Sequence, residues 1–181
     1  MRGTGSNTVL FDRVFVPETA VIMRRPQNVW PPALSVVVTV AMPLIMSVYL
    51  GIAETAADQA RQTASKRPED PDLQRLVGEM ENALLTADLA INDMIDRARD
   101  YDFEAALEHA NRTLMCKTVA TRAVITVVEK AMEAVGGAGF YRRFGLERLL
   151  RDIRAAHYHP LPESRQLRFT GRVALGLSPV D

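Results

Sequence analysis

Residues 131–171 hold the side chains of this sequence whose types and spacing could carry chemistry. They comprise a glycine-rich turn, a basic amphipathic segment and the pair His157 and His159, which Pro160 follows. A neutral imidazole can donate a hydrogen bond or accept a proton near neutral pH, because its ordinary pKa lies close to that range. The same histidine could instead do no more than cap the turn before the proline. Any catalytic contribution of the chain is expected in this stretch.

The glycine-rich turn contains Gly136, Gly137 and Gly139 and follows a long helical pattern. Gly136 and Gly137 are expected to supply the positive φ angles that close a helix C-terminus, and Gly139 leaves one more position without a Cβ. Such a backbone lets a ligand approach closely, although a helix cap explains the glycines equally well. A Rossmann phosphate loop is disfavoured, because a helix precedes the turn and the spacing G-x-G-x-x-G is not met.

The basic segment at residues 145–154 predicts a short helix with one apolar face. At helical spacing, this face carries Leu146, Leu149, Leu150 and Ile153. Arginines occupy the rest of the surface, at Arg148, Arg151 and Arg154. We expect solvated or ion-paired arginines, although a guanidinium near a glycine turn could also bind phosphate oxygens.

Four long helices are expected to position these residues, because apolar side chains recur at spacings of three and four. The predicted helices cover an uncharged run at residues 28–53 and its continuation to residue 66, a segment that begins after a cap at Asp70 or Asp72, residues 104–135 and residues 163–175. Four helices with short connections predict an all-α fold, namely an antiparallel four-helix bundle.

The uncharged run at residues 28–53 is long enough to cross a bilayer. Polar residues and Pro43 interrupt it, and no basic residues follow it closely, so we predict a buried or interfacial helix and no membrane span. An apolar helix of this kind favours a homodimer or homotetramer. Replacing Val38 or Ile45 by aspartate is expected to break that assembly, because either change would bury an unpaired charge.

Composition narrows the function classes. The chain has 181 residues, enough for one domain with a sizeable core. Lys and Arg (22) balance Asp and Glu (22), so no net field favours nucleic acid. No zinc-type ligand spacing is present in the sequence, and no metal site is expected. The single Cys116 and a start without secretory-signal character predict a cytoplasmic protein.

Three stretches in order carry a family resemblance. Residues 6–17 alternate like a short N-terminal β segment that ends at Pro17. The stretch around them, MRGTGSNTVLFDRVFVPE (1–18), together with GGAGF (136–140) and LERLLRDIRAAHYHPL (146–161), resembles the acyl-CoA dehydrogenase superfamily. The resemblance implies that residues 1–20 end a β-barrel middle domain, 21–32 form a proline-rich linker and 33–181 form the C-terminal helical bundle. The chain then looks like the C-terminal part of an enzyme, and alone it is expected to be inactive.

The resemblance also implies a flavin cofactor, FAD, between barrel and bundle. The glycine turn of a neighbouring subunit would contact its adenosine and pyrophosphate end, a motif that Gly136, Gly137 and Gly139 match. Glu133 stands where many family members carry glutamine. The arginine and phenylalanine of the usual FAD motif are replaced by residues 66–72.

The catalytic glutamate of family members that desaturate an acyl thioester has no direct match. Counting without gaps from Arg151 and Asp152 puts Pro160 at its place. A gap would bring Glu163 there, at the cost of the match that Arg172 makes with a family arginine. The resemblance also extends to two-component flavin monooxygenases, which receive reduced flavin from a separate reductase and often carry a histidine in this region. His159 is the better candidate of the histidine pair, because it adjoins the mapped base position.

Three functions therefore stay open from the sequence. The first, which we favour, is an acyl-CoA dehydrogenase-like oxidoreductase that desaturates an acyl-CoA, passes electrons to FAD and then to an electron acceptor. The second is a monooxygenase on the same scaffold with His159 near the flavin and a flavin reductase as partner. The third is a helical assembly domain without chemistry of its own. The missing glutamate counts against the first, and the histidines favour the second.

Overall fold

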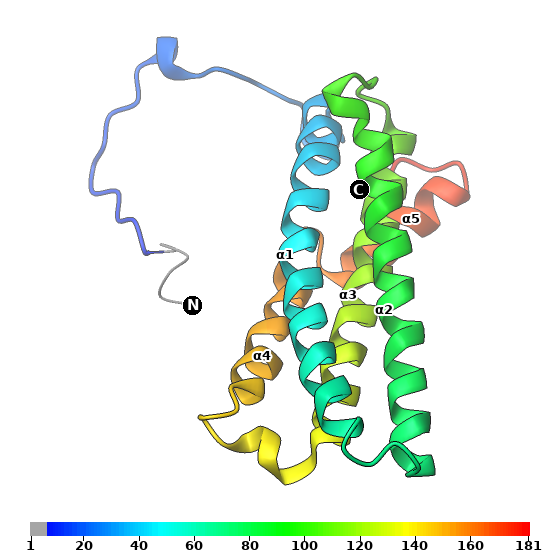
Figure 1. Cartoon of the computed structure of the whole chain (residues 1–181). Coiled ribbons are helices and arrows are strands. Elements are labelled where there is room, and N and C mark those ends of the chain that lie inside the picture. The colour runs from blue at the N-terminus through cyan, green and yellow to red at the C-terminus, as the bar shows by residue number, and fades with distance from the viewer. Residues whose placement is uncertain (1–6) are drawn as a thin grey trace.

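The computed structural model describes residues 7–181, and within that range it contains helices but no strand. Three long helices form the body of the molecule: α1 (Pro32–Ala64), α2 (Pro71–Ala98) and α3 (Leu107–Val135). They run antiparallel to their chain neighbours and lie side by side in both ribbon views (Figure 1). The all-α class is confirmed.

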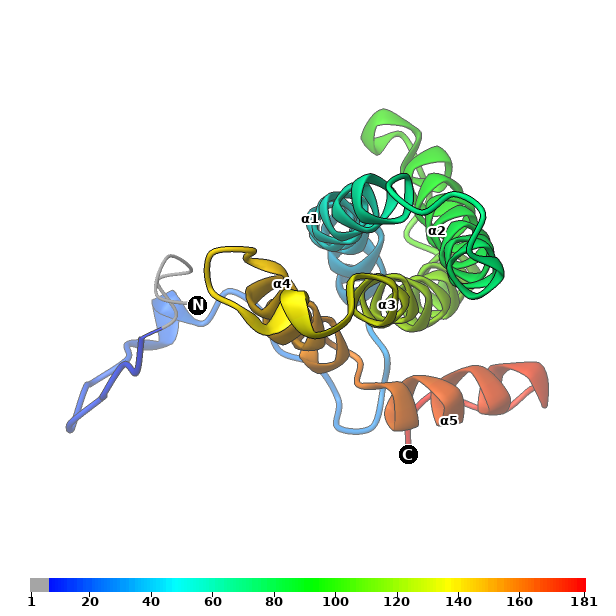
Figure 2. The ribbon, with the colours of Figure 1, turned by 60° about the horizontal axis from the view of Figure 1, so that its bottom comes forward.

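Two shorter helices complete the fold, α4 (Leu146–Ile153) and α5 (Glu163–Ala174). The amphipathic segment predicted around 145–154 is α4, and it packs against α3 and α1. The view along the bundle shows α5 extending outward beyond α3, against which it packs (Figure 2). The fourth place in the bundle is therefore filled by α4, although the sequence pattern had assigned it to the helix at 163–175.

Short 3-10 segments connect or flank these helices. They are η2 (Glu18–Ala20), η3 (Arg99–Tyr101), η4 (Gly136–Phe140) and η5 (Arg154–Tyr158). The segment η4 is the glycine-rich turn, and η5 leads from α4 to the histidine pair. These two segments therefore set the position of every candidate site residue predicted from the sequence except Glu133 and Glu163.

Local capping explains where α2 begins and where α3 ends. The side chain of Asp70 accepts hydrogen bonds from the backbone N–H groups of Asp72 and Leu73, and Pro71 starts α2. Asp70 is thus the cap, one of the two residues predicted for it. At the same end of the bundle, α3 stops at Gly136, whose φ of 69° is accessible to glycine at little cost.

The core lies between the three long helices. Large side chains sealed from solvent come from all three of them and include Met46, Met80, Ile91, Met94, Leu114 and Val124. Ile95 on α2 and Val119 on α3 are exposed, although both are apolar residues at helical spacing. Val38 is buried in this same core, so an aspartate there would unfold the chain and could not report on assembly. The outward face of α1 carries Leu44 and Val48.

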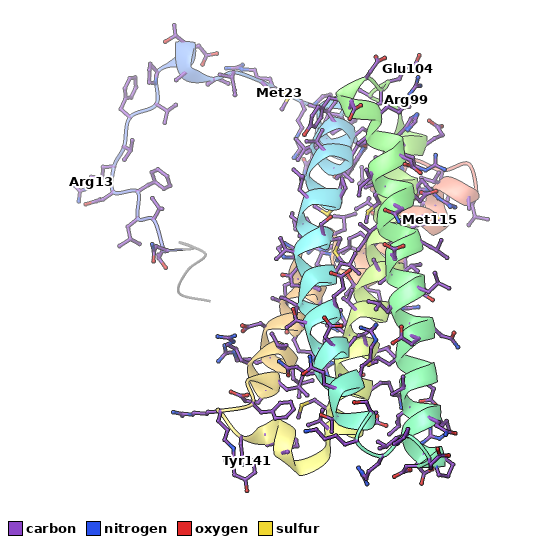
Figure 3. All side chains as sticks on the ribbon, in the orientation of Figure 1. Arg13, Met23, Arg99, Glu104, Met115 and Tyr141 are labelled. Atoms are coloured by element: carbon purple, nitrogen blue, oxygen red, sulfur yellow. The ribbon has the colours of Figure 1, made fainter. Side chains whose placement is uncertain are left out.

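The N-terminal arm, residues 7–31, corrects one expectation. The predicted β segment does not form over residues 7–17, which are exposed and contain no helix or strand, and its first residue lies outside the described range. A strand needs a ladder of hydrogen bonds with a neighbouring strand, and none is described in residues 7–181. Figure 3 shows Arg13 and Met23 on this arm, which leaves the bundle at the start of α1. The assignment of residues 1–20 to a barrel domain stays a prediction.

By length and composition alone, α1 could cross a membrane. The core helix of a soluble protein passes the same test, and α1 contributes buried side chains to contacts with α2 and α3. Those contacts are the ones expected of a bundle helix.

Candidate functional site

The centre of the candidate site is a contact between α1 and the turn before α5. Tyr49 on α1 is only 7% exposed, and its hydroxyl lies 2.6 Å from Nε2 of His159. The two rings meet edge to face, with centroids 5.4 Å apart. The other ring nitrogen of His159, Nδ1, has no hydrogen-bond partner within residues 7–181 and is not sealed from solvent. The imidazole is thus held on one side and open on the other.

A buried lysine fixes the main chain on both sides of Pro160. Lys117 on α3 is 1% exposed, and its Nζ donates hydrogen bonds to the carbonyl oxygens of His159 and Leu161, at 3.1 and 3.2 Å. Burying an ammonium group is costly unless polar partners replace water. The two carbonyls supply that replacement, so Lys117 ties the turn to α3.

Burial and charge set the protonation of this cluster. Burial lowers the pKa of His159, and the nearby Lys117 ammonium lowers it further. Burial also raises the pKa of the Tyr49 phenol, with a further increase from the charge of Asp152 on α4. At neutral pH the site therefore presents a neutral imidazole and a protonated phenol.

Glu163, the alternative base, lies at the first position of α5 and is paired with the guanidinium of Arg122. The hydrogen bond from Arg122 is the main cause that lowers the pKa of this carboxyl group. A carboxylate with a lowered pKa is a weaker proton acceptor. The geometry therefore favours His159 over Glu163 for proton transfer, although a substrate that displaced Arg122 would free the carboxylate.

The three glycines of the turn differ in their surroundings. Gly139 is buried, and a Cβ there would lie 3.1 Å from the sulfur of Met132 and 3.3 Å from Leu146, so a larger residue would force these side chains to shift. Gly136 and Gly137 are exposed, and an added Cβ would meet nothing within 4 Å. Only Gly136 has a positive φ, so the expectation of a second one at Gly137 was wrong.

The surroundings of the turn fit the phosphate end of a flavin. Gly136 and Gly137 leave open space beside a bare backbone, which a ligand could approach closely. Arg142 and Arg143 follow on the exposed side, and the Arg143 guanidinium lies over the Tyr141 ring, 5.8 Å from its centroid. These features suit an anionic group. Gly139, which packs inward, shapes the turn without facing this space.

Glu133, the remaining predicted cofactor residue, is exposed in the last turn of α3. Its carboxylate accepts hydrogen bonds from Lys130, at 3.0 and 3.1 Å, and Lys130 also pairs with Glu79 on α2. Any contact between Glu133 and a cofactor would therefore share the carboxylate with Lys130.

The structure does not bring the glycine turn and the histidine together. At about 1.5 Å per residue, the helix between Lys117, which holds the His159 turn, and Gly136 spans roughly 28 Å. Tyr141, just after the glycines, lies at the opposite end of the bundle from Arg99 and Glu104 (Figure 3). Within one chain these are two separate places.

A pocket of about 460 Å³ opens where α1 meets α2, lined by Arg61, Arg67, Leu73 and Gln74 among others. The connection between α1 and α2 lies at the same end of the bundle as the glycine turn (Figure 1). It contains residues 66–72, which replace the usual FAD motif of the resembled family. The Arg61 guanidinium is already engaged by Glu81 and Asp58.

Tyr49 and Lys117 were missed by sequence reasoning. Lys117 carried a signal, because it falls three residues after Leu114 and seven before Val124, on the inward face of the third helix. A lysine at a core position of an amphipathic helix needs polar partners. Tyr49 lies inside the uncharged run and was treated as one more apolar residue.

A second polar cluster ties α2 to α3 and has a structural character. Asp93 bonds Arg97, Arg112 and the thiol of Cys116, and the two guanidinium groups lower the pKa of its carboxyl group. Burial and the Asp93 charge raise the pKa of Cys116 to about 11, so the thiol is unreactive at neutral pH. Among residues 7–181, no group of three or more histidine, cysteine or acidic side chains is arranged to hold a metal ion.

Comparisons with known proteins place this arrangement in a family. Residues 37–158 match the family described as acyl-CoA dehydrogenase, C-terminal domain. YdbM of Bacillus subtilis (strain 168), whose name assigns it provisionally to the acyl-CoA dehydrogenases, is 30% identical over 88% of this chain and 42% of its own length. The amino sugar nitrososynthase DnmZ of Streptomyces peucetius is 30% identical over 97% of this chain and 46% of its own length.

Oxygenases appear among the matches as well. A dibenzothiophene monooxygenase of Rhodococcus erythropolis is 30% identical over 75% of this chain and 37% of its own length. The structure of KijD3 in complex with FMN and a dTDP-linked 3-amino-4-keto sugar superposes with a TM-score of 0.73 and 26% identity, covering 86% of this chain and 41% of that one. The chain spans less than half the length of each of these proteins.

The family match covers most of the chain, and the superposition covers 86% of it. Members of the family are flavin-dependent oxidoreductases and monooxygenases. The chain belongs to the acyl-CoA dehydrogenase family and forms its C-terminal helical domain.

Proposed function

We propose that this chain is the C-terminal helical part of a flavin-dependent monooxygenase that oxygenates a small organic molecule, with His159 as the protein group nearest the chemistry. The observation that carries the proposal is the held imidazole. His159 adjoins the position of the family's catalytic glutamate, is fixed by Tyr49 and Lys117, and leaves Nδ1 open. Pro160, at the glutamate position itself, can neither accept nor donate a proton.

The cofactor would supply electrons to oxygen: reduced flavin, O2 and substrate give oxidised flavin, oxygenated substrate and water. This stoichiometry requires a source of reduced flavin, and we propose that a separate flavin reductase supplies it. The chain's own residues exclude water on the Tyr49 side of His159 and keep the imidazole neutral, so that Nδ1 can donate a hydrogen bond toward the reacting groups. The names of three matched proteins, a nitrososynthase, a monooxygenase and an FMN-bound sugar-binding protein, support this class.

The flavin itself is proposed to be FMN or FAD. KijD3 is described with FMN, whereas the family resemblance implied FAD. Gly136 and Gly137, with the arginines after them, suit a phosphate group of either cofactor. Because this turn lies far from His159 within one chain, we infer that it serves the cofactor of a neighbouring subunit. On that ground we propose a homodimer or homotetramer, and we propose a cytoplasmic protein because the single Cys116 suits a reducing compartment.

Acyl-CoA desaturation is the second candidate, supported by the match to YdbM. It needs a base that removes the α-proton while a hydride leaves for FAD, and an electron acceptor to reoxidise the cofactor. Glu163 would have to leave Arg122 to serve, or His159 would have to take the role. A helical assembly domain without chemistry is the third reading, and it applies to the isolated chain.

One experiment separates these readings. The complete protein that carries this chain is purified, loaded with flavin and mixed anaerobically with a series of acyl-CoA thioesters. We expect no bleaching of the oxidised flavin band. The same protein, given reduced FMN or FAD and oxygen, is expected to oxygenate a dTDP-amino sugar or an aromatic sulfur heterocycle. Bleaching by an acyl-CoA would contradict the proposal and support desaturation, and failure to bind flavin would support the assembly domain.

A further inference from the structure

Tyr49 has one hydrogen-bond partner, and that fact fixes the direction of the bond. Its hydroxyl contacts Nε2 of His159 and makes no other hydrogen bond within residues 7–181. If the imidazole donated from Nε2, the phenolic hydrogen would be left without an acceptor on a side chain that is 7% exposed. A buried donor without an acceptor is unfavourable. The phenol therefore donates, and Nε2 accepts.

We propose that Tyr49 is a positioning residue that holds His159 in the tautomer with its proton on Nδ1, so that an N–H donor faces the open side of the site. Only the catalytic use of this N–H donor rests on the proposed function. The tautomer itself follows from the contact. In a neutral imidazole one nitrogen donates and the other accepts, so an acceptor role for Nε2 places the proton on Nδ1.

The ring cannot easily escape this arrangement, because its backbone is held separately. Lys117 binds the carbonyl of His159 and that of Leu161 from α3, while Tyr49 holds the ring from α1. The residue is thus fixed by two helices at two different atoms. Without the phenol, the backbone would stay in place while the ring proton redistributed between the two nitrogens.

The charged groups around the pair favour a neutral imidazole at His159. Lys117 is the cation whose charge acts on His159, and it disfavours a second proton on the ring. Asp152 on α4 acts on Tyr49 and Glu163 on α5 acts on Lys117, whereas neither carboxylate is hydrogen bonded to the imidazole. His157 acts on Glu163 and not on the ring of His159. No acceptor among the described residues competes with Nε2 for the phenolic hydrogen.

Nitrogen-15 NMR of the 181-residue chain tests the tautomer without any substrate or cofactor. The chain has three histidines, and a His159→Gln variant assigns the signals of the one in question. Above the titration range, we expect the ring proton of His159 on Nδ1 in the wild type and a mixture of both tautomers in Tyr49→Phe. Tyr158→Phe, an exposed tyrosine beside the same histidine, is the matched control and should leave the spectrum of His159 unchanged. A wild-type proton on Nε2, or the same tautomer in Tyr49→Phe, would overturn the inference.

A kinetic measurement on the complete flavin-loaded protein tests the consequence. Tyr49→Phe should lower kcat for oxygenated product and the share of reduced flavin that yields it by about twofold to fivefold, with KM unchanged, because only the fraction of rings that keep the proton on Nδ1 presents the donor. If the wild-type protein oxygenates its substrate and Tyr49→Phe turns the same share of reduced flavin into product, the role of Tyr49 would be contradicted. A wild-type protein without oxygenation would contradict the proposed function, and the NMR result would then still decide the role of Tyr49 toward His159.

Discussion

The phenol of Tyr49 lies 2.6 Å from Nε2 of His159, a residue 110 positions later in the chain. This contact joins the first helix of the bundle to the turn that precedes α5. Lys117, from the middle of α3, holds the backbone of the same turn through two carbonyl oxygens. Two helices, α1 and α3, thus hold the turn that carries His159, and the predictions below test what each contributes.

Replacing Lys117 by methionine should destabilise the chain. Two charge-assisted hydrogen bonds to the His159 and Leu161 carbonyls are lost, while part of the cost of burying an ammonium is recovered. We expect the first effect to dominate, so that the free energy of unfolding falls by about 1 kcal/mol. Urea denaturation measures it, with Lys66→Met on the exposed connection as the control that should stay within about 0.5 kcal/mol. A Lys117→Met chain as stable as the wild type would show that the lysine does not anchor the turn.

Acidification should weaken the fold through His159. Its pKa in the folded chain lies below the ordinary value of 6.5, because burial and Lys117 disfavour the charged ring. Between those two values the unfolded chain binds more protons, so this stabilisation is complete above about pH 6.5 and is lost as the pH falls through the folded pKa. The free energy of unfolding should therefore drop between pH 7.5 and pH 5.5, and less so in His159→Gln. Equal pH dependence in the two chains would exclude His159 as the source.

Replacing Gly137 by valine should impair flavin binding and spare the fold. Gly137 has no positive φ, and an added Cβ meets nothing within 4 Å, so stability is expected to change by less than about 0.5 kcal/mol. In the complete assembled protein, the branched side chain would occupy the space where a phosphate approaches, and the flavin dissociation constant should rise about tenfold or more. Flavin fluorescence during titration measures this constant. Gly171→Val on α5, also open to solvent, is the control. Unchanged affinity in Gly137→Val would make the turn purely structural.

The outward face of α1 tests the proposed assembly better than the core does. Leu44 and Val48 are 60% and 65% exposed and lie one helical turn apart. Changing both to aspartate should leave the chain folded, as judged by circular dichroism, and should reduce the mass of the complete protein in solution, as measured by light scattering. The control is Leu177→Asp, another exposed leucine. A double variant with the wild-type mass would rule out this face as the subunit interface.

Local signals made much of the fold predictable. Asp70 before Pro71 and Gly136 after Val135 mark helix ends by capping chemistry that depends only on neighbouring residues. The β segment at 6–17 was misjudged for the opposite reason, since a strand exists only with a partner strand. The direction of α5 likewise depends on packing that periodicity does not record.

The candidate site was predictable in part. His159 was proposed because a family resemblance placed it beside the base position, and Gly136 and Gly137 were proposed because they match the family's cofactor-binding turn. Tyr49 could not be paired with His159 from the sequence, because no periodicity links residues 110 positions apart. Lys117 could have been noticed as a charged residue on an apolar helix face, although its partners are backbone carbonyls, which any sequence supplies.

The most direct test of the proposed monooxygenase follows the oxygen atom. The complete protein is mixed with reduced flavin, ¹⁸O2 and either an aromatic sulfur heterocycle or a dTDP-amino sugar, and the product is analysed by mass spectrometry. We expect one labelled oxygen per product molecule, with a yield about a hundredfold lower in His159→Gln, because a placed proton donor or acceptor contributes at least that factor. If no labelled oxygen entered the substrate and an acyl-CoA bleached the flavin anaerobically, the proposal would be contradicted and the protein would be identified as a dehydrogenase.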